Sequence, residues 1–446
     1  MKEHHVGSLI FAERRRLLLA FACGYFIPAE EIISNALASP ACSGDYVTPE
    51  MFGAVGGGAD DTSAIQSALA TNLPVYLRTR YRITDSLSVG RQVLFGTSSH
   101  TSGLTVDHEF KLSSPAVIRL TGGEPGGEIR DIGIFFFQPN VSDRAALIGY
   151  PAAIVAQMPR FKLARLRIER ALIGIDMRGN AGGATLDDIE LSAFEKGICV
   201  DGALDSVKIS NLHIWPFGIA DKQRQIFSDA ENVGLHSGRC DDLHLTNATI
   251  YGIPKAALFT KTKHGATFGT LLNVDFDHYG GLHVESANLR VIGCSFTAGE
   301  QTARWLRLAD GDLTLGSCWF HSAAELSVPG IEVGAHGAIT LNGATFSTRG
   351  NDFVHLYCAS GGVINASGIN IRKHKDVHYV NPLFKFDAGS RFGLHQTIVS
   401  PLGSGSGLFI DAQPGARGLT SGVQAPGWRS RIANSKGKNV DLDSVE

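Results

Sequence analysis

Two carboxylates separated by one residue lie in the middle of the sequence, where Asp275 and Asp277 flank Phe276. If this segment is a β-strand with Phe276 pointing inward, both aspartates point outward, with their Cα atoms roughly 6.5–7 Å apart. Two such carboxyls suit acid–base chemistry across one glycosidic bond. Their mutual repulsion raises one pKa and so supplies a general acid near neutral pH. His278 follows directly and is a third catalytic candidate.

A second acidic cluster precedes this pair, where Glu190 follows Asp187 and Asp188. Glu190 is therefore the fourth catalytic candidate. The alternative for Asp275 and Asp277 is that they form a solvated turn at the end of a strand. The candidates for substrate binding are aromatic, imidazole and guanidinium side chains, which stack on sugar rings or bind polar groups. They are Arg167, His213, Trp215, Arg224 and Tyr251.

A repeat of apolar residues predicts the elements that position these side chains. One series closes a short apolar segment in each repeat, at Ile168, Leu191, Ile214, Ile250, Phe276, Phe296, Phe320 and Phe346. A second series falls between them, at Ile175, Ile198, Leu235, Leu258, Leu282, Leu306, Ile331 and Val354. Each segment alternates with period 2, so the repeat predicts stacked coils of β-strands with a continuous core. Phe296, Phe320 and Phe346 should then form an aromatic stack.

The residues on either side of the closing series should point outward and form one broad groove. The preceding ladder is Arg167, Glu190, His213, Thr249, Asp275, Ser295, Trp319 and Thr345. The following ladder is Glu169, Ser192, Trp215, Tyr251, Asp277, Thr297, His321 and Ser347. The spacing between successive members increases in one coil of both series, because of an insertion at 215–232 that contains Arg224. The insertion is either a functional loop or a neutral one, because solenoids tolerate insertions well.

A motif near residue 50 resembles the opening of pectate-lyase-like, right-handed parallel β-helix proteins. The segment 46–69 reads YVTPEMFGAVGGGADDTSAIQSAL, and Gly57 stands where the family usually has Asp. The matching residues are Phe52, Gly53, Ala54, Gly56, Gly58, Asp60, Asp61, Thr62, Ala64, Ile65, Gln66 and Ala68. A short helix should follow, with Asp60 or Asp61 as its cap and with Ala64, Ile65, Ala68 and Leu69 on its apolar face.

The resemblance implies an all-β, right-handed parallel β-helix solenoid with a short N-terminal capping helix. The family includes phage tailspikes, polygalacturonase-related hydrolases and alginate epimerases, so the resemblance implies a polysaccharide substrate and a homotrimer. We expect an extracellular depolymerase, with hydrolysis favoured over elimination. The alternatives are a polysaccharide lyase or epimerase, and a non-catalytic carbohydrate-binding adhesin or phage tail protein. The Asp-Pro-His-Glu-type signature of the epimerases is absent, which disfavours that alternative.

Three segments are predicted along the chain. Residues 1–44 form a signal or an attachment segment, because three arginines precede the apolar run 17–27 and Ala36-Leu37-Ala38 resembles a cleavage site. The arginines resemble a twin-arginine signal, which predicts a secreted or periplasmic protein; the alternative is a virion tail. The β-helix should span 45–372. The Gly- and Ser-rich segment 373–446 should cap the far end and take part in oligomer contacts.

Composition excludes several classes of function. The net charge of −3 lacks the basic patch of a nucleic-acid-binding protein, and no long apolar helix follows the N-terminus. The seven cysteines form no disulfide framework, and no Cys/His cluster has metal-site spacing, so we expect no metal and no cofactor. Cys294 and Cys318 should instead lie reduced in the core, in a ladder of small residues with Ala344.

Overall fold

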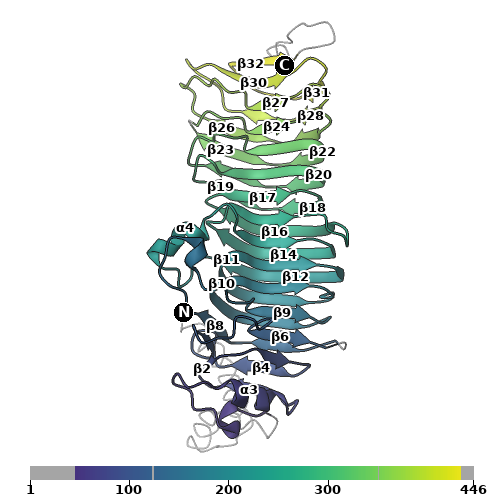
Figure 1. Ribbon diagram of the computed structural model, residues 1–446. Helices are drawn as coiled ribbons and strands as arrows, with labels where there is room; N and C mark the ends of the chain where they lie inside the picture. Colours follow the sequence, from purple (N-terminus) through teal and green to yellow (C-terminus); the bar gives the residue numbers. More distant parts are fainter. Residues whose placement is uncertain (1–45, 123–124, 350, 433–446) are drawn as a thin grey trace, which may run out of the picture. The chain divides into compact units, whose positions relative to one another are not determined.

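The structure, a computed structural model, describes residues 46–432 except 123, 124 and 350. The segment 1–44, predicted as a signal or attachment segment, lies outside the described residues, so that prediction stays open. Within the described part of the chain, no helix is both long enough and apolar enough to cross a membrane. The described residues form one solenoid of stacked coils (Figure 1).

Helices are few and short, and strands make up each coil. The helical elements are η1 (Pro49–Phe52), α3 (Thr62–Leu69), η2 (Arg144–Ala146), η3 (Asp221–Gln223) and α4 (Arg224–Phe227). The first strands are β1 (Val75–Leu77), β2 (Arg80–Ile83), β3 (Leu87–Val89), β4 (Val93–Gly96), β5 (Gly103–Val106), β6 (Ile118–Thr121), β7 (Glu128–Arg130), β8 (Gly133–Phe136) and β9 (Ile154–Gln157).

The middle coils contain the longest strands. These are β10 (Lys162–Arg178), β11 (Thr185–Asp201), β12 (Ala203–Ile214), β13 (Val233–Ser237), β14 (Cys240–Tyr251), β15 (Lys255–Phe259), β16 (Thr267–Asp277), β17 (Gly280–Val284), β18 (Ala287–Ile292), β19 (Ser295–Ala298), β20 (Arg304–Gly316), β21 (Trp319–Ser322), β22 (Ile331–Asn342) and β23 (Thr345–Arg349). The last coils contain β24 (Leu356–Cys358), β25 (Val363–Ser367), β26 (Asn370–Lys373), β27 (Phe384–Phe386), β28 (Arg391–His395), β29 (Ile398–Val399), β30 (Gly407–Ala412), β31 (Arg417–Ser421) and β32 (Trp428–Ile432).

The strands form three parallel sheets that run along the solenoid. In the first coils the sheets begin as β1–β4–β7, β2–β5–β8 and β3–β6–β9, which we call the first, second and third sheets. Strand β10 then pairs with β7, β8 and β9, so one long strand contributes to all three sheets. Each coil pairs only with its neighbours, and this pattern is the right-handed parallel β-helix that the repeat and the motif predicted.

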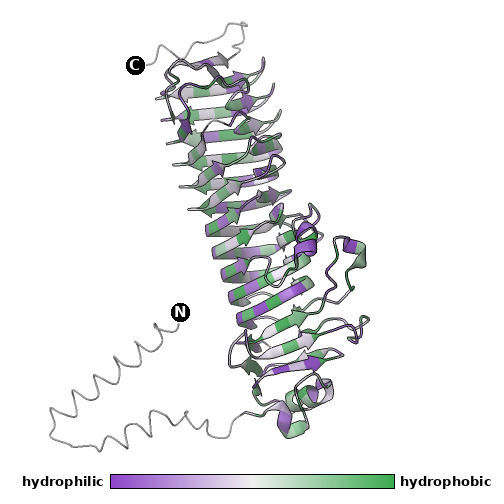
Figure 2. Ribbon diagram, turned by 90° about the vertical axis from the view of Figure 1, so that its left-hand side faces the viewer, coloured by the Kyte–Doolittle hydropathy of each residue, from purple (hydrophilic) through white to green (hydrophobic). Residues whose placement is uncertain are grey.

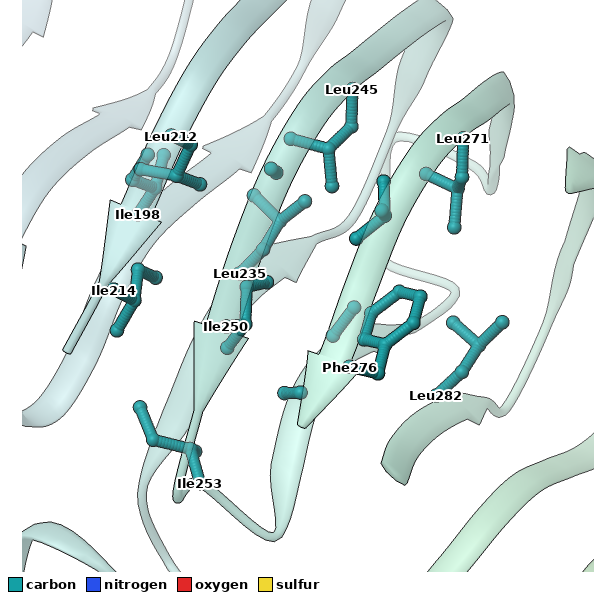
Figure 3. Packing of buried hydrophobic residues seen from close by; sticks show 14 of the residues in the cluster. Ile198, Leu212, Ile214, Leu235, Leu245, Ile250, Ile253, Leu271, Phe276 and Leu282 are labelled. Atoms are coloured by element: carbon teal, nitrogen blue, oxygen red, sulfur yellow. The ribbon is translucent and has the colours of Figure 1, made fainter. Parts of the chain in front are cut away.

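The closing apolar residues form one continuous buried ladder in the second sheet. Strand pairing connects Ile168 through Leu191, Ile214, Ile250, Phe276, Phe296 and Phe320 to Phe346, in the register that the sequence predicted. The rings of Phe296, Phe320 and Phe346 stack with centroids 4.9 Å apart, so the predicted aromatic stack is confirmed. Figure 3 shows Ile214, Ile250 and Phe276 inside three successive coils. Cys294 and Cys318 are buried free thiols, as expected.

The second apolar series is correct except at two members. Leu235 pairs with Ala257 rather than Leu258, and Ile331 pairs with Leu356 rather than Val354. Ala257 and Leu356 are fully buried, whereas Leu258 and Val354 are only half-buried. At the first position the prediction chose the larger apolar residue, whereas the core accepts the small Ala257. At the second position, Leu356 lies 25 residues after Ile331, which is the spacing of the preceding pair Leu306 and Ile331.

In most coils, a left-handed bend separates the first sheet from the second. The residue three positions before the closing residue has a φ between +47° and +70° in ten successive coils. These residues are Arg165, Asp188, Asn211, Asn247, Asn273, Gly293, Ser317, Gly343, Gly368 and Gln396. Asn and Gly tolerate this conformation best, and they occupy six of these ten positions.

The N-terminal end of the solenoid is covered by α3, whose buried residues are Ala64, Ile65, Ala68 and Leu69, as predicted. The two aspartates before it have different roles. Asp60 lies one residue before the N-cap position, and its Oδ1 accepts the N–H of Thr62, the first residue of the helix, at 3.1 Å. Asp61 is buried, and its carboxylate accepts the N–H groups of Val55 and Gly56 at 2.8 and 3.0 Å. Asp61 therefore stabilises the preceding glycine-rich loop rather than capping the helix with its side chain.

Coils continue beyond residue 372, where the sequence suggested a boundary. Strands β25, β28 and β31 continue the first sheet in register, and β27, β30 and β32 continue the third. Hydrophilic and hydrophobic residues alternate along the strands throughout (Figure 2). The described residues after 372 are thus further coils; their expected role in capping and oligomer contacts stays a prediction.

Candidate functional site

The outward face of the second sheet carries the two ladders that the sequence predicted. Strand pairing joins Arg167, Glu190, His213, Thr249, Asp275, Ser295, Trp319 and Thr345 in that order. In the following ladder, Tyr251 pairs with Asp277, and Thr297 pairs with His321. Ser192 differs from the other members in being fully buried, because the 215–232 insertion covers it: its hydroxyl donates to the carbonyl of Phe217 at 2.8 Å. We call this outward surface the second-sheet face.

Asp275 and Asp277 lie at the end of β16, on either side of the fully buried Phe276. Both aspartates are half-buried, and alternation along the strand places them on the same face. Burial raises the pKa of the Asp275 carboxyl; a hydrogen bond with Ser295 opposes this rise, and the Asp277 carboxylate adds to it. The pair therefore contains one carboxyl that holds its proton to higher pH than an ordinary aspartate, as a general acid must.

An aromatic row begins two coils before this pair and ends beside it. The rings of Trp215 and Tyr251 lie 4.1 Å apart between centroids, and those of Tyr251 and His278 lie 5.6 Å apart and stacked. Trp215 is 38% exposed, so one side of the row is open to solvent. His278 has a left-handed φ of +78°, and its Nε2 lies 3.5 Å from Glu300 Oε1. The structure thus brings together Asp275, Asp277, His278, Trp215 and Tyr251.

Glu190 belongs to a separate cluster around Arg167. The Arg167 guanidinium donates to Glu169 Oε1 at 2.5 Å and to Glu190, and it lies 4.6 Å above the ring of Phe217. His213 pairs with Glu190 on the next coil, and its ring is 5.1 Å from Phe217. Burial lowers the pKa of His213, Glu190 opposes this shift, and Arg167 adds to it. Because Arg167 neutralises Glu190, this cluster is arranged as an ion-pair network.

Three strand pairings separate Glu190 from Asp275 along the ladder. At roughly 4.8 Å per coil, the two residues are about 14 Å apart. One glycosidic bond cannot reach both carboxylates. Of the four catalytic candidates, the structure therefore groups Asp275, Asp277 and His278 and leaves Glu190 apart.

The insertion at 215–232 begins at the aromatic row and packs against a second loop. Gln223 Nε2 donates to the carbonyl of Pro139 at 2.7 Å, and Arg144 donates to the carbonyl of Ile226 at 3.2 Å. Helix α4 lies beside β11 (Figure 1). The loop at 137–150 was not predicted, because it lies before the part of the chain in which the repeat is regular. Arg224 is exposed on α4 and forms an ion pair with Asp221 at 3.4 Å.

Three polar side chains lie beside the candidates but were not predicted as site residues. Glu300 approaches His278, Glu169 pairs with Arg167, and His100 Nε2 lies 3.9 Å from Glu190. Glu169 was visible as a ladder member next to Arg167. Glu300 and His100 lie in irregular segments outside both ladders, so no sequence pattern indicates them. Among the residues that the structure describes, no group of three or more His, Cys, Asp or Glu side chains is placed to hold a metal ion.

Comparisons with known proteins show which known structures share this fold. No family model and no curated protein matches the sequence. Among solved structures, the pre-mature bacteriophage phi29 gene product 12 has a TM-score of 0.61 at 12% identity, over 89% of this chain and 58% of that chain. Its N-terminal fragment has a TM-score of 0.56 at 13% identity, over 89% and 73%. The catalytic unit of a GH87 α-1,3-glucanase from Streptomyces thermodiastaticus has a TM-score of 0.50 at 13% identity, over 88% and 71%.

These similarities agree with the strand pairing on the fold: the chain is a right-handed parallel β-helix protein, as the motif at 46–69 predicted. This chain spans little more than half of the pre-mature gene product 12 chain, so the comparison concerns part of that protein.

Proposed function

We propose that this protein binds a polysaccharide along the second-sheet face and hydrolyses its glycosidic bonds at Asp275 and Asp277. The observation that carries the proposal is the juxtaposition of a half-buried carboxyl of raised pKa, a second carboxyl on the same strand and an open aromatic row on the preceding coils. Aromatic faces stack on sugar rings, while paired carboxyls perform acid–base chemistry at the bond between them. The fold likeness to a glucanase is compatible with this proposal.

In the proposed reaction, the protonated Asp275 donates its proton to the glycosidic oxygen as the bond to the anomeric carbon breaks. The Asp277 carboxylate either takes a proton from the attacking water or attacks the anomeric carbon itself; in the second case a water that gives its proton to Asp275 then displaces Asp277 from the anomeric carbon. The first route inverts and the second retains the configuration of the anomeric carbon. Trp215 and Tyr251 hold the sugar on the side of the preceding coils, and His278, oriented by Tyr251 and Glu300, completes the polar surroundings.

A second candidate function is glycan binding without catalysis, as in an adhesin or a phage tail protein. The specific observation in its favour is that the aromatic row needs neither aspartate in order to bind a sugar. The fold likeness to a bacteriophage gene product also supports a virion location as the alternative to secretion. Sequencing the N-terminus of the native protein separates these locations, because a secreted form should begin near Ser39 or Cys42, whereas a virion protein should keep its first residues.

The test is incubation with a panel of polysaccharides that includes an α-1,3-glucan, other neutral glucans and polyuronates. New reducing ends without an unsaturated product support hydrolysis. New ends together with the ultraviolet absorbance of an unsaturated uronate would indicate a lyase, and changed uronate composition without new ends would indicate an epimerase. Binding without any product would support the adhesin, and the absence of both binding and products would contradict the proposal.

A further inference from the structure

Two coils beyond Asp275, the second-sheet face carries an exposed tryptophan that the proposed chemistry does not use. Trp319 is 47% exposed, and register connects Asp275 to Ser295 and Ser295 to Trp319. At roughly 4.8 Å per coil, Trp319 is about 9–10 Å from Asp275 along the solenoid. The aromatic row of Trp215 and Tyr251 lies on the opposite side of the aspartates. The carboxylate pair is therefore bracketed by aromatic side chains along the same face.

Trp319 and His321 form a flat aromatic surface, which we call the shelf, on which a sugar ring can stack. The ring of His321 lies 5.5 Å from that of Trp319 and stacked with it, and His321 Nδ1 is 2.8 Å from the carbonyl of Ser347. The buried Trp305 donates its indole N–H to the carbonyl of His321 at 2.8 Å. These contacts fix the backbone and the imidazole beside Trp319, so little conformational freedom is lost when a ligand binds.

Small hydroxyl side chains border the shelf on both sides. Ser295 and Thr297 lie on the coil before it, and Thr345 and Ser347 lie on the coil after it. Short side chains leave the faces of Trp319 and His321 open, and their hydroxyls can exchange hydrogen bonds with a sugar. This combination of an exposed aromatic face and flanking hydroxyls is how a saccharide subsite is built, whereas a core contact would bury the indole.

We propose that Trp319 and His321 form a distal saccharide subsite, so that the glycan runs along the solenoid axis and contacts both aromatic regions. This inference rests on the proposed function of the same face. A glycan long enough to reach from Tyr251 across Asp277 to His321 would contact four successive coils. Chains that end before Ser295 and Thr297 would bind only the Trp215 side. The protein should therefore prefer long chains, and Trp319 should be the source of that preference.

The experiment uses the full chain carrying Asp275→Asn, which should bind without turnover, and oligosaccharides prepared by partial hydrolysis of the polysaccharide that binds in the panel. Trp319→Ala is added to one sample and Phe268→Ala to a control, because Phe268 is a 50% exposed aromatic residue of β16 outside both ladders. We expect Trp319→Ala to weaken the binding of the longest fragments about tenfold. Binding of the shortest fragments that still bind should be unchanged, and Phe268→Ala should change neither.

Equal loss for short and long fragments, or no loss for either, would overturn the distal subsite. In those cases the proposed function stands, because wild-type protein still binds and the panel reports its products separately. If no polysaccharide binds to the wild-type protein, both proposals fail together. Circular dichroism of each variant verifies that the coils are intact.

Discussion

At the scale of single residues, the environments of Asp275 and Asp277 decide which chemistry the second-sheet face can perform. Asp275 is half-buried beside Ser295 and has a raised pKa, whereas Glu190 is paired with Arg167. The Glu190 carboxylate already accepts the guanidinium of Arg167, so it is occupied by a partner within the protein. The proposed chemistry therefore belongs to the aspartates.

Replacing either aspartate by asparagine should remove catalysis and preserve the fold. We expect Asp275→Asn and Asp277→Asn each to lower turnover by at least about 10²-fold, as expected when a general acid or base is lost. Asp312→Asn is the matched control, because Asp312 is exposed on a strand of the first sheet. Initial rates on the polysaccharide identified by the panel report the effect. Near-full activity in both variants would move the site to Glu190 and His213.

The Asp275 carboxyl should make the protein less stable as pH rises, which is the reverse of the effect of an ion-paired carboxylate. Because the folded-state pKa of Asp275 is raised above its ordinary value of 3.8, the folded state holds the proton more tightly than the unfolded state. Its contribution to stability is thus lost as pH rises through that raised value. An asparagine side chain carries no charge at any pH, so Asp275→Asn should gain thermal stability relative to the wild type between pH 4 and pH 7.

Asp85 provides a control, because its pKa is shifted in the opposite direction to that of Asp275. A hydrogen bond from Ser114 lowers the pKa of Asp85, so its contribution to stability is present at neutral pH and is lost as pH falls. Asp85→Asn should therefore lose stability relative to the wild type as pH rises through the acidic range below about pH 4, and it should change little relative to the wild type between pH 4 and pH 7. Melting temperatures of the three proteins at about pH 2, pH 4 and pH 7 check this. Parallel pH dependence for the two variants would contradict the assigned environments.

At the scale of elements, the left-handed bends and the close contacts between coils explain why glycine occurs where it does. Gly343 has a φ of +70°, and an added Cβ would meet Ser317 Oγ at 3.9 Å, which is an ordinary contact. Gly311 has a φ of +104°, and an added Cβ would lie 2.0 Å from the carbonyl oxygen of Ala287. Gly343 is therefore required only because its backbone is left-handed. Gly311 is required for its backbone conformation and also because a Cβ would not fit.

The two glycines should therefore respond differently to alanine. Gly343→Ala should lower the free energy of unfolding by about 1–2 kcal/mol, which is the cost of a left-handed residue with a side chain. Gly311→Ala should lower it by about 3 kcal/mol or more, because overpacking adds to that cost. Urea unfolding followed by circular dichroism measures both. Equal losses would mean that the coils move apart easily at Gly311.

Sequence periodicity predicted the second sheet better than any other part of the molecule. Its closing residues are large and apolar in every coil, so register follows from spacing alone. The third sheet was predicted less well, because Ala257 is too small to be recognised beside Leu258. The prediction of residues around the site succeeded on the regular strands and failed in the loops. Outward ladder members such as Trp319 were placed correctly, while Glu300 and His100 come from loops of irregular length, and spacing in the chain cannot place them.

At the scale of the whole molecule, the described coils leave apolar side chains on the surface at several places. Leu272 and Ile292 pair directly on adjacent coils and are 36% and 41% exposed, and Leu419 is 65% exposed on a later coil. A solenoid one coil thick has much surface per residue, so association between chains is an effective way to cover such groups.

We predict that the protein is a homotrimer, as the family resemblance implies. Light scattering after size-exclusion chromatography at micromolar concentration should give three times the chain mass of 47.6 kDa. Replacing Leu272 and Ile292 by serine should weaken the assembly if these residues lie in the interface. A monomeric mass for the unmodified protein would refute the prediction.

The most direct test of the central claim is a crystal structure of the Asp275→Asn variant with a bound fragment of the polysaccharide identified by the panel. We expect a glycan lying along the second-sheet face, with a sugar ring on Trp215 or Tyr251 and a glycosidic oxygen within hydrogen-bond distance of the substituted side chain. A glycan bound on the first or third sheet, away from Asp275 and Asp277, would contradict it.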